Sequence, residues 1–215
     1  MKLISVNVGV SREMEWQGRS VLTSIWKEAV GGRVMARRTN LDGDRQSDLT
    51  VHGGPEKAVY AYPSEHYPFW RNELGEIELP WGSFGENLTT DGIVESETMI
   101  GDRLAIGSAE LMITQPRSPC FKLGIRFGRD DMVRRFIHSG RSGFYLSVVR
   151  EGEIGSGDRV EFISRDPHRL SVADVARLYA RESTDPELLR RAVEVEALPD
   201  GWREYFRNRL NAIER

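Results

Sequence analysis

The chain has 215 residues, enough for one sizeable domain or for one domain with a small appendage. Hydrophobic residues make up 39% and charged residues 29%, and a net charge of −3 gives no chain-wide basic surface for nucleic acid. No apolar run approaches the roughly 20 residues that span a bilayer, and residues 1–10 lack the layout of a signal peptide. The single cysteine, Cys120, cannot form an intrachain disulfide, which fits a reducing compartment. We therefore expect a cytoplasmic protein that binds neither membranes nor nucleic acid.

Residues 1–166 are rich in glycine and contain short apolar runs bounded by Gly, Asp or Pro. This pattern predicts short antiparallel strands of a barrel or sandwich. The predicted strands are Lys2–Val8, Arg33–Arg37, Ala58–Tyr62, Arg103–Ile106, Glu110–Gln115, Gly143–Arg150 and Arg159–Ile163. A few helices interrupt them, one of which begins near Ser64 and another of which covers Asp130–Ile137.

Glycine nearly vanishes after Asp166-Pro167, and helical spacing of apolar residues replaces the strand pattern. The tail predicts three short helices. Ser171 can cap the first helix, Asp185 and Pro186 begin the second, and Pro199 precedes the third. Their apolar stripes, with Tyr and Trp among them, are expected to pack as core because short helices need mutual packing.

Residues 43–60 form the first candidate site. His52 is followed by two glycines, so an anionic or planar ligand can approach backbone N–H groups beside an imidazole. Arg45 and Lys57 can add positive charge. A tight turn into the following strand, with His52 bonded locally, explains the same residues.

Residues 82–92 form the second candidate site. Glycines and small polar residues suit a loop over a cleft, and the amide of Asn87 can both donate and accept hydrogen bonds. An ordinary loop explains this segment equally well.

Cys120 lies in the third candidate segment, where two prolines fix the backbone just before the thiol. Arg117 and Lys122 flank the cysteine, and if they are also close in space they favour the thiolate, which attacks substrates or binds metals. A small buried cysteine is the alternative, but the polar, turn-rich context favours function. Cys120 is therefore the candidate centre of the active site. A nucleophilic pair of Cys120 with His52 also stays open.

Together the three segments resemble the signature blocks of MOSC-domain proteins, named after the C-terminal domain of molybdenum cofactor sulfurases. The blocks are His52–Tyr60, Gly85–Leu88 and Gln115–Leu123. Their order, with a three-helix tail behind them, is most similar to the bacterial YiiM-type branch. The resemblance implies a mainly β, barrel-like MOSC domain over residues 1–166 and a small C-terminal 3-alpha domain over residues 167–215.

The resemblance also implies a molybdopterin-type molybdenum cofactor and the reduction of N-hydroxylated compounds, such as purine or pyrimidine bases, to amines. Cys120 corresponds to the proposed molybdenum ligand of the family. His52 is our candidate for the proton donor, because imidazole titrates near neutral pH. The expected cofactor contacts are Arg45, His52, Lys57, Asn87, Arg117 and Lys122.

The chain has no obvious flavin, haem or iron–sulfur motif, so as an enzyme it needs an external electron-donor protein. One alternative is a carrier of molybdenum cofactor or sulfur that uses Cys120 without turnover. Another is a non-catalytic binding module with the helical tail as its partner surface. A homo-oligomer is compatible with the sequence.

Overall fold

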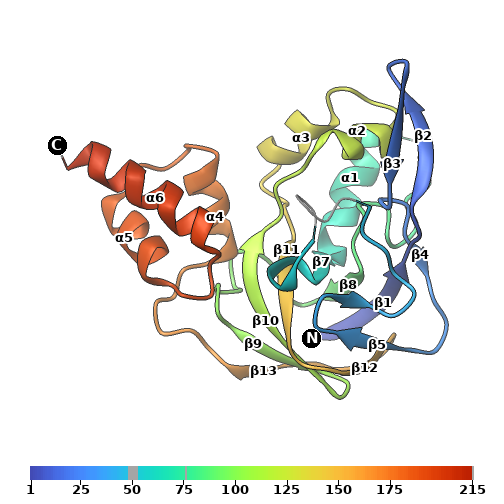
Figure 1. Cartoon of the computed structure of the whole chain (residues 1–215), viewed down its shortest axis with the longest axis horizontal. Coiled ribbons are helices and arrows are strands. Elements are labelled where there is room, and N and C mark those ends of the chain that lie inside the picture. The colour runs from blue at the N-terminus through green and yellow to red at the C-terminus, as the bar shows by residue number, and fades with distance from the viewer. Residues whose placement is uncertain (48–52, 76, 215) are drawn as a thin grey trace.

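Three helices lie beside a larger, mainly β part in the computed structural model of the chain (Figure 1). The structure describes residues 1–47, 53–75 and 77–214. The strands are β1 (Lys2–Val8), β2 (Arg12–Trp16), β3 (Arg19–Thr23), β4 (Glu28–Ala29), β5 (Arg33–Arg37), β6 (Asn40–Leu41), β7 (Val59–Pro63), β8 (Leu88–Asp91), β9 (Arg103–Ile106), β10 (Ala109–Pro116), β11 (Phe144–Arg150), β12 (Gly152–Gly155) and β13 (Val160–Ser164). The helices are η1 (Pro55–Lys57), η2 (Ser64–His66), α1 (Tyr67–Leu74), α2 (Phe121–Phe127), α3 (Met132–His138), α4 (Val172–Tyr179), α5 (Pro186–Glu194) and α6 (Asp200–Ile213).

The main sheet has eight strands in the order β13-β9-β10-β11-β7-β8-β1-β4. Neighbouring strands are antiparallel except β7 and β8, which are parallel because the chain crosses over through α1 between them. The sheet curls, so that β1 near one end meets the start of β13 at the other, with the amide of Leu3 donating to the Asp158 carbonyl at 2.9 Å. Over the described residues no closed barrel forms. The expected barrel-like arrangement of antiparallel strands is present as a curled sheet that contains one parallel pair.

Every predicted strand is confirmed, with ends displaced by no more than one residue. The expectation of a loop over residues 82–92 is wrong for its last part, because Leu88–Asp91 forms β8 between β7 and β1. The polar threonines there are buried, and the Thr89 hydroxyl donates to Glu86 while accepting from Asn7. These tertiary partners satisfy the hydroxyl of Thr89, which resembles a loop residue in the sequence alone.

The C-terminal helices begin where the sequence predicts. Ser171 and Asp174 form a reciprocal capping box at α4, and the Asp185 carboxylate accepts from the amide of Glu187 at the start of α5. The amide of Val172 donates to the Thr98 carbonyl at 2.9 Å, which ties α4 to the β part. One apolar core contains both the sheet and the helices, and the boundary near residue 166 stays a prediction.

The expectation that the aromatic residues of the tail are core is correct for Phe206, is met in part by Trp202 and Tyr205, which pack against the core, and is wrong for Tyr179. Tyr179 is 47% exposed, and Trp202 and Tyr205 are half-buried. Their rings lie on the side of the helices that faces the β part, where they line a cavity with Pro119.

A second, aromatic cluster fills the space between the sheet and helices α1 to α3. It includes Tyr60, Tyr62, Tyr67, Trp70, Phe84 and Phe136, all nearly inaccessible to solvent. Ring edges and faces meet at distances such as 4.7 Å between the centroids of Tyr62 and Phe84. The candidate site rests on this cluster.

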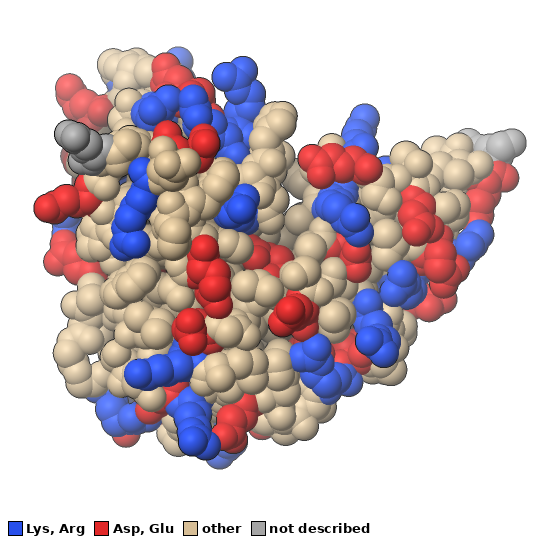
Figure 2. All heavy atoms as spheres, turned by 180° about the vertical axis from the view of Figure 1, so that it is seen from behind, with Lys and Arg blue, Asp and Glu red and all other residues tan. Residues whose placement is uncertain are grey.

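Positive and negative side chains are interspersed over the face of the molecule seen in Figure 2, on the helical part as well as on the β part. Positive charge is therefore not gathered in one place on this face. Among the described residues, no helix combines the length and the apolarity needed to cross a bilayer.

Candidate functional site

One pocket brings together residues from all three candidate segments. It lies where the chain leaves β3 and β10 and where it enters β7 and β8, next to η1. The predicted site residues that line it are Arg45, Lys57, Asn87, Arg117, Cys120 and Lys122. His52, the remaining predicted residue, lies outside the described residues.

Cys120 occupies the turn between β10 and α2. Its backbone is extended, with φ −121° and ψ 174°, and its carbonyl accepts the amide of Leu123 at 2.9 Å in the first turn of the helix. The thiol is partly accessible and has no disulfide partner. A free thiol at the wall of a pocket is available to a ligand, in contrast to a cysteine packed in the core.

The guanidinium of Arg117 forms the inner wall of the pocket. It donates to the Phe84 carbonyl at 2.8 Å and lies 4.8 Å from the centre of the Tyr60 ring. Burial opposes its charge, but the hydroxyls of Tyr60 and Tyr145 and the Cys120 thiol outweigh that effect and raise the pKa of Arg117 above its usual value. Arg117 therefore stays a fixed cation beside the thiol.

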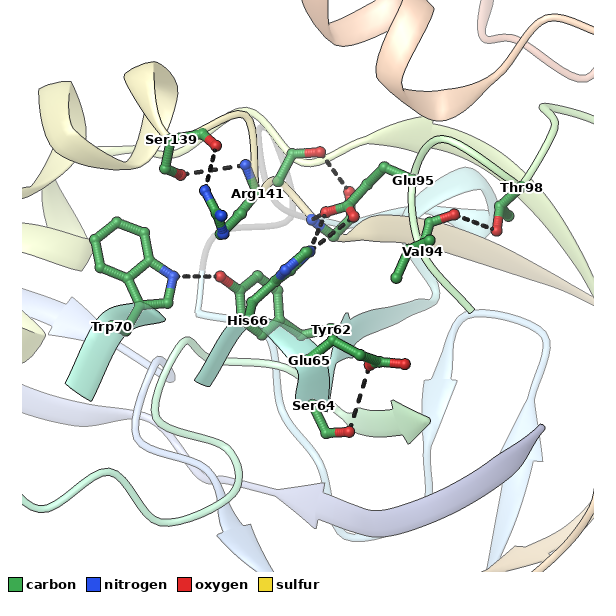
Figure 3. A network of polar contacts seen from close by, with 12 residues as sticks. Tyr62, Ser64, Glu65, His66, Trp70, Val94, Glu95, Thr98, Ser139 and Arg141 are labelled. Atoms are coloured by element: carbon green, nitrogen blue, oxygen red, sulfur yellow. Dashed lines mark hydrogen bonds and ion pairs between the residues drawn. The ribbon is translucent and has the colours of Figure 1, made fainter. Parts of the chain in front are cut away.

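Figure 3 shows a network of polar contacts around Glu95 and His66, which extends to the backbone of the Arg117 loop. The Glu95 carboxylate contacts His66 at 2.7 Å and accepts the amide of Gly143 at 2.6 Å, and the Gly143 carbonyl accepts the amide of Arg117 at 3.4 Å. Gly143 has φ +60°, and a Cβ there would lie 2.5 Å from the Ala61 carbonyl oxygen. Only glycine fits this junction, which fixes the position of the Arg117 loop relative to β7.

The pocket has a positive balance of charge. Among the described residues that line it, five carry positive charge (Lys27, Arg45, Lys57, Arg117 and Lys122) and one, Asp44, carries a carboxylate. The ammonium of Lys122 reaches the Ser47 hydroxyl at 3.2 Å across the pocket. Such a wall attracts an anionic group, for example a phosphate.

Lys27 and Asp44 form the floor of the pocket and were not predicted from the sequence as site residues. The Lys27 ammonium lies 2.5 Å from the Asp44 carboxylate, and the two side chains are 8% and 1% exposed. Burial lowers the pKa of Lys27, and the adjacent Asp44 opposes that shift. Asp44 lies within residues 43–60, the first candidate site, whereas no local sequence pattern around Lys27 indicates a site.

The side chain of Asn87 links this floor to the strands. Its amide group donates to the Asp44 carboxylate at 3.0 Å and to the Asn7 carbonyl at 3.3 Å, and its oxygen accepts the amide of Tyr60 at 3.1 Å. Asn87 thus lines the pocket while joining β1, β7 and β8. Its predicted contact with a cofactor stays a prediction.

Glu86 is fully buried beside the pocket and shapes the loop that presents the Phe84 carbonyl to Arg117. Its carboxylate accepts from the amides of Gly82 (2.8 Å) and Phe84 (3.0 Å) and from the Tyr67 hydroxyl. Burial raises the pKa of Glu86 above 4.5, although these hydrogen bonds oppose the shift. The native protein therefore releases this proton at a higher pH than the unfolded chain does.

We expect the change Glu86→Gln to alter how the free energy of unfolding depends on pH. A carboxyl with a raised native pKa stabilises most below its unfolded pKa, and that stability is lost as the pH rises to the native pKa. In urea denaturation from pH 4 to 7, the wild type should lose up to about 1.4 kcal/mol per pH unit relative to the variant. Equal slopes for the two proteins would contradict this assignment.

Known protein families match both the part of the chain that contains the three segments and the helical tail. Residues 48–161 match the MOSC domain, and residues 170–212 match the YiiM-like 3-alpha helix domain. The chain is 37% identical over 211 residues to YflK of Bacillus subtilis (strain 168), which covers 98% of this chain and 95% of YflK. The crystal structure of YiiM from Geobacillus stearothermophilus shares 31% identity and a TM-score of 0.80, covering 97% of this chain and 98% of that one.

A third relative is a longer protein. A protein of Gibberella moniliformis (strain M3125 / FGSC 7600) that is named a reductase is 34% identical over 175 residues. The match covers 80% of this chain and 31% of that protein. This chain is therefore similar to one part of the longer fungal protein.

Proposed function

Because this chain belongs to the MOSC-domain family and carries the YiiM-like 3-alpha domain, we propose that it is a molybdenum-cofactor-dependent reductase of N-hydroxylated compounds. The observation that carries the proposal is the pocket in which Cys120 lies with the basic side chains of Lys27, Arg45, Lys57, Arg117 and Lys122. The reductase name of the fungal relative supports the same reaction class.

The donor set of the pocket suits a molybdopterin-type cofactor. A thiolate is a soft ligand of the kind that molybdenum accepts, and Cys120 would hold the metal. Arg45, Lys57 and Lys122 would bind the phosphate of the cofactor, because basic side chains bind phosphate through charge-assisted hydrogen bonds. Arg117, which Phe84 and Tyr60 hold in place, would keep a positive charge next to the metal ligand.

Reduction of an N-hydroxylated compound breaks the N–O bond. The substrate R–NH–OH takes up two electrons and two protons and yields R–NH₂ and water. The molybdenum centre supplies the electron pair when the cofactor is bound. His52 is proposed to protonate the departing hydroxyl oxygen. The electrons come from an external donor protein, because the sequence offers no flavin, haem or iron–sulfur motif.

Metal analysis and a reduction assay test this proposal together. Protein purified in its native state should contain about one molybdenum per chain. With a reduced dye as electron donor, it should convert an N-hydroxylated purine to the amine. Bound molybdenum without turnover of any N-hydroxylated compound would contradict the enzyme and favour a cofactor or sulfur carrier. Protein that takes up no molybdenum cofactor would contradict both.

A further inference from the structure

A second cavity lies on the other side of Cys120, between the Cys120 loop and the C-terminal helices. It measures about 450 Å³, within the range of small-molecule sites. Four residues line both this cavity and the cationic pocket: Lys57, Ser118, Cys120 and Tyr145. We call it the interdomain cavity, and Cys120 is thus accessible from two sides.

The helical wall of the interdomain cavity is aromatic. Tyr179 ends α4, and Trp202 and Tyr205 come from α6. The rings of Tyr179 and Trp202 lie 4.8 Å apart, and those of Tyr179 and Tyr205 lie 5.8 Å apart. Amphipathic helices normally bury such residues, yet Tyr179 is 47% exposed. Apolar ring surface of these residues is therefore open to the interdomain cavity.

The aromatic wall is held in position relative to Cys120. The indole N–H of Trp202 donates to the side-chain oxygen of Gln115 at 2.7 Å. Gln115 lies near the end of β10, five residues before Cys120, so one hydrogen bond fixes the helical wall to the segment that carries the thiol. The opposite wall includes Lys57, Ser118 and Tyr145.

The two cavities differ in chemistry. The cationic pocket suits an anionic group, whereas the interdomain cavity combines an aromatic wall with neutral side chains such as Gln115 and Ser118, and Lys57 is the one cation among its described lining residues. Flat, uncharged heterocycles bind to walls of this second kind, because their faces stack on aromatic rings and their edges need donors and acceptors.

We propose that the interdomain cavity is the substrate site and that Tyr179, Trp202 and Tyr205 bind the planar ring of an uncharged N-hydroxylated heterocycle. This assignment rests on the proposed function for the reaction, while the binding site itself is defined by the cavity. The helical domain then selects substrates by their ring, and the cationic pocket holds the cofactor on the far side of Cys120.

Replacement of Tyr179 tests the substrate site with little risk to the fold, because half of its side chain is exposed. The probe is adenine, the planar ring without a hydroxylamine group, titrated calorimetrically into the full-length protein. We expect Tyr179→Ala to raise the Kd by about three- to tenfold, the size of one aromatic contact. Tyr179→Phe, which keeps the ring, should stay within twofold of the wild type.

Ile213→Ala is the matched control, because Ile213 is a similarly exposed apolar residue of α6 outside the interdomain cavity. It should leave the Kd unchanged. In turnover, Tyr179→Ala should raise KM for an N-hydroxylated purine by the same factor and leave KM for hydroxylamine, which has no ring, within twofold.

Two results would overturn the substrate site: wild-type protein that does not bind adenine, or Tyr179→Ala protein that binds it as tightly as the wild type. Ring-dependent binding in a wild type that reduces no N-hydroxylated compound would support the cavity assignment and count against the proposed reaction alone. The two failures are therefore distinguishable.

Discussion

Replacing Cys120 with alanine is expected to lower the molybdenum content at least about tenfold and to reduce turnover to background. Loss of supporting groups around a metal ligand already costs about 10–100-fold in affinity or activity, and loss of the ligand itself should cost no less. The basic side chains of the pocket remain in this variant, so phosphate contacts alone would have to retain the cofactor. Molybdenum per chain after native purification and the rate with a reduced dye measure the two effects.

Stability provides the control for this result. Cys120 is partly exposed and lies outside both apolar cores. The thermal midpoint of the Cys120→Ala protein should therefore differ from that of the wild type by no more than about 4 °C. Cys120→Ser keeps the size of the side chain and should fail in the same way, because a hydroxyl is a poor substitute for a soft thiolate. If the alanine variant kept both molybdenum and turnover, Cys120 would not be the metal ligand.

Seven of the thirteen described strands could be predicted, because each of these runs of apolar residues is closed by a local signal, whereas the short or exposed strands β2, β3, β4, β6 and β12 were missed. Gly-Asp turns precede β9 and β13, and a capping serine or a first-turn proline marks α4 and α5. The failures lie where tertiary contacts override local pattern. Thr89 resembles a loop residue until Glu86 and Asn7 satisfy its hydroxyl, and α2 follows a proline-rich turn that gives no helical stripe.

Part of the candidate site could be predicted from the sequence for the same reason. Arg117, Cys120 and Lys122 belong to one short segment, so their proximity follows from the chain itself. The approach of Arg45 depends on a contact distant in sequence, in which its amide donates to the Gly9 carbonyl at 2.8 Å. The pairing of Lys27 with Asp44 is visible only in three dimensions. Exposure of Tyr179 was also missed, because helical periodicity shows which face is apolar but not what covers it.

We expect Asp44→Ala to lower the free energy of unfolding by about 3–5 kcal/mol, the range observed when one partner of a buried ion pair is removed. Asp44 is 1% exposed, and it also accepts hydrogen bonds from the amide of Gly9 and from Asn87. Its loss leaves the Lys27 ammonium buried without a counter-charge and leaves two donors unsatisfied. Urea denaturation at pH 7 measures the change.

The pH dependence identifies the cause of this loss. Burial already lowers the pKa of Lys27, and removal of Asp44 takes away the interaction that opposes that shift. Between the lowered native pKa and the usual value of 10.5, the unfolded chain binds more protons, so the free energy of unfolding rises with pH. The loss of stability in Asp44→Ala should therefore shrink as the pH is raised from 7 toward 9.5.

The double variant Lys27→Met/Asp44→Ala buries no charge at this place. Part of the lost free energy of unfolding should return in it, and the pH dependence of the loss should vanish. A loss of stability that does not depend on pH and is not reduced by Lys27→Met would contradict the buried charge as its cause. It would then be due to the lost hydrogen bonds of Asp44.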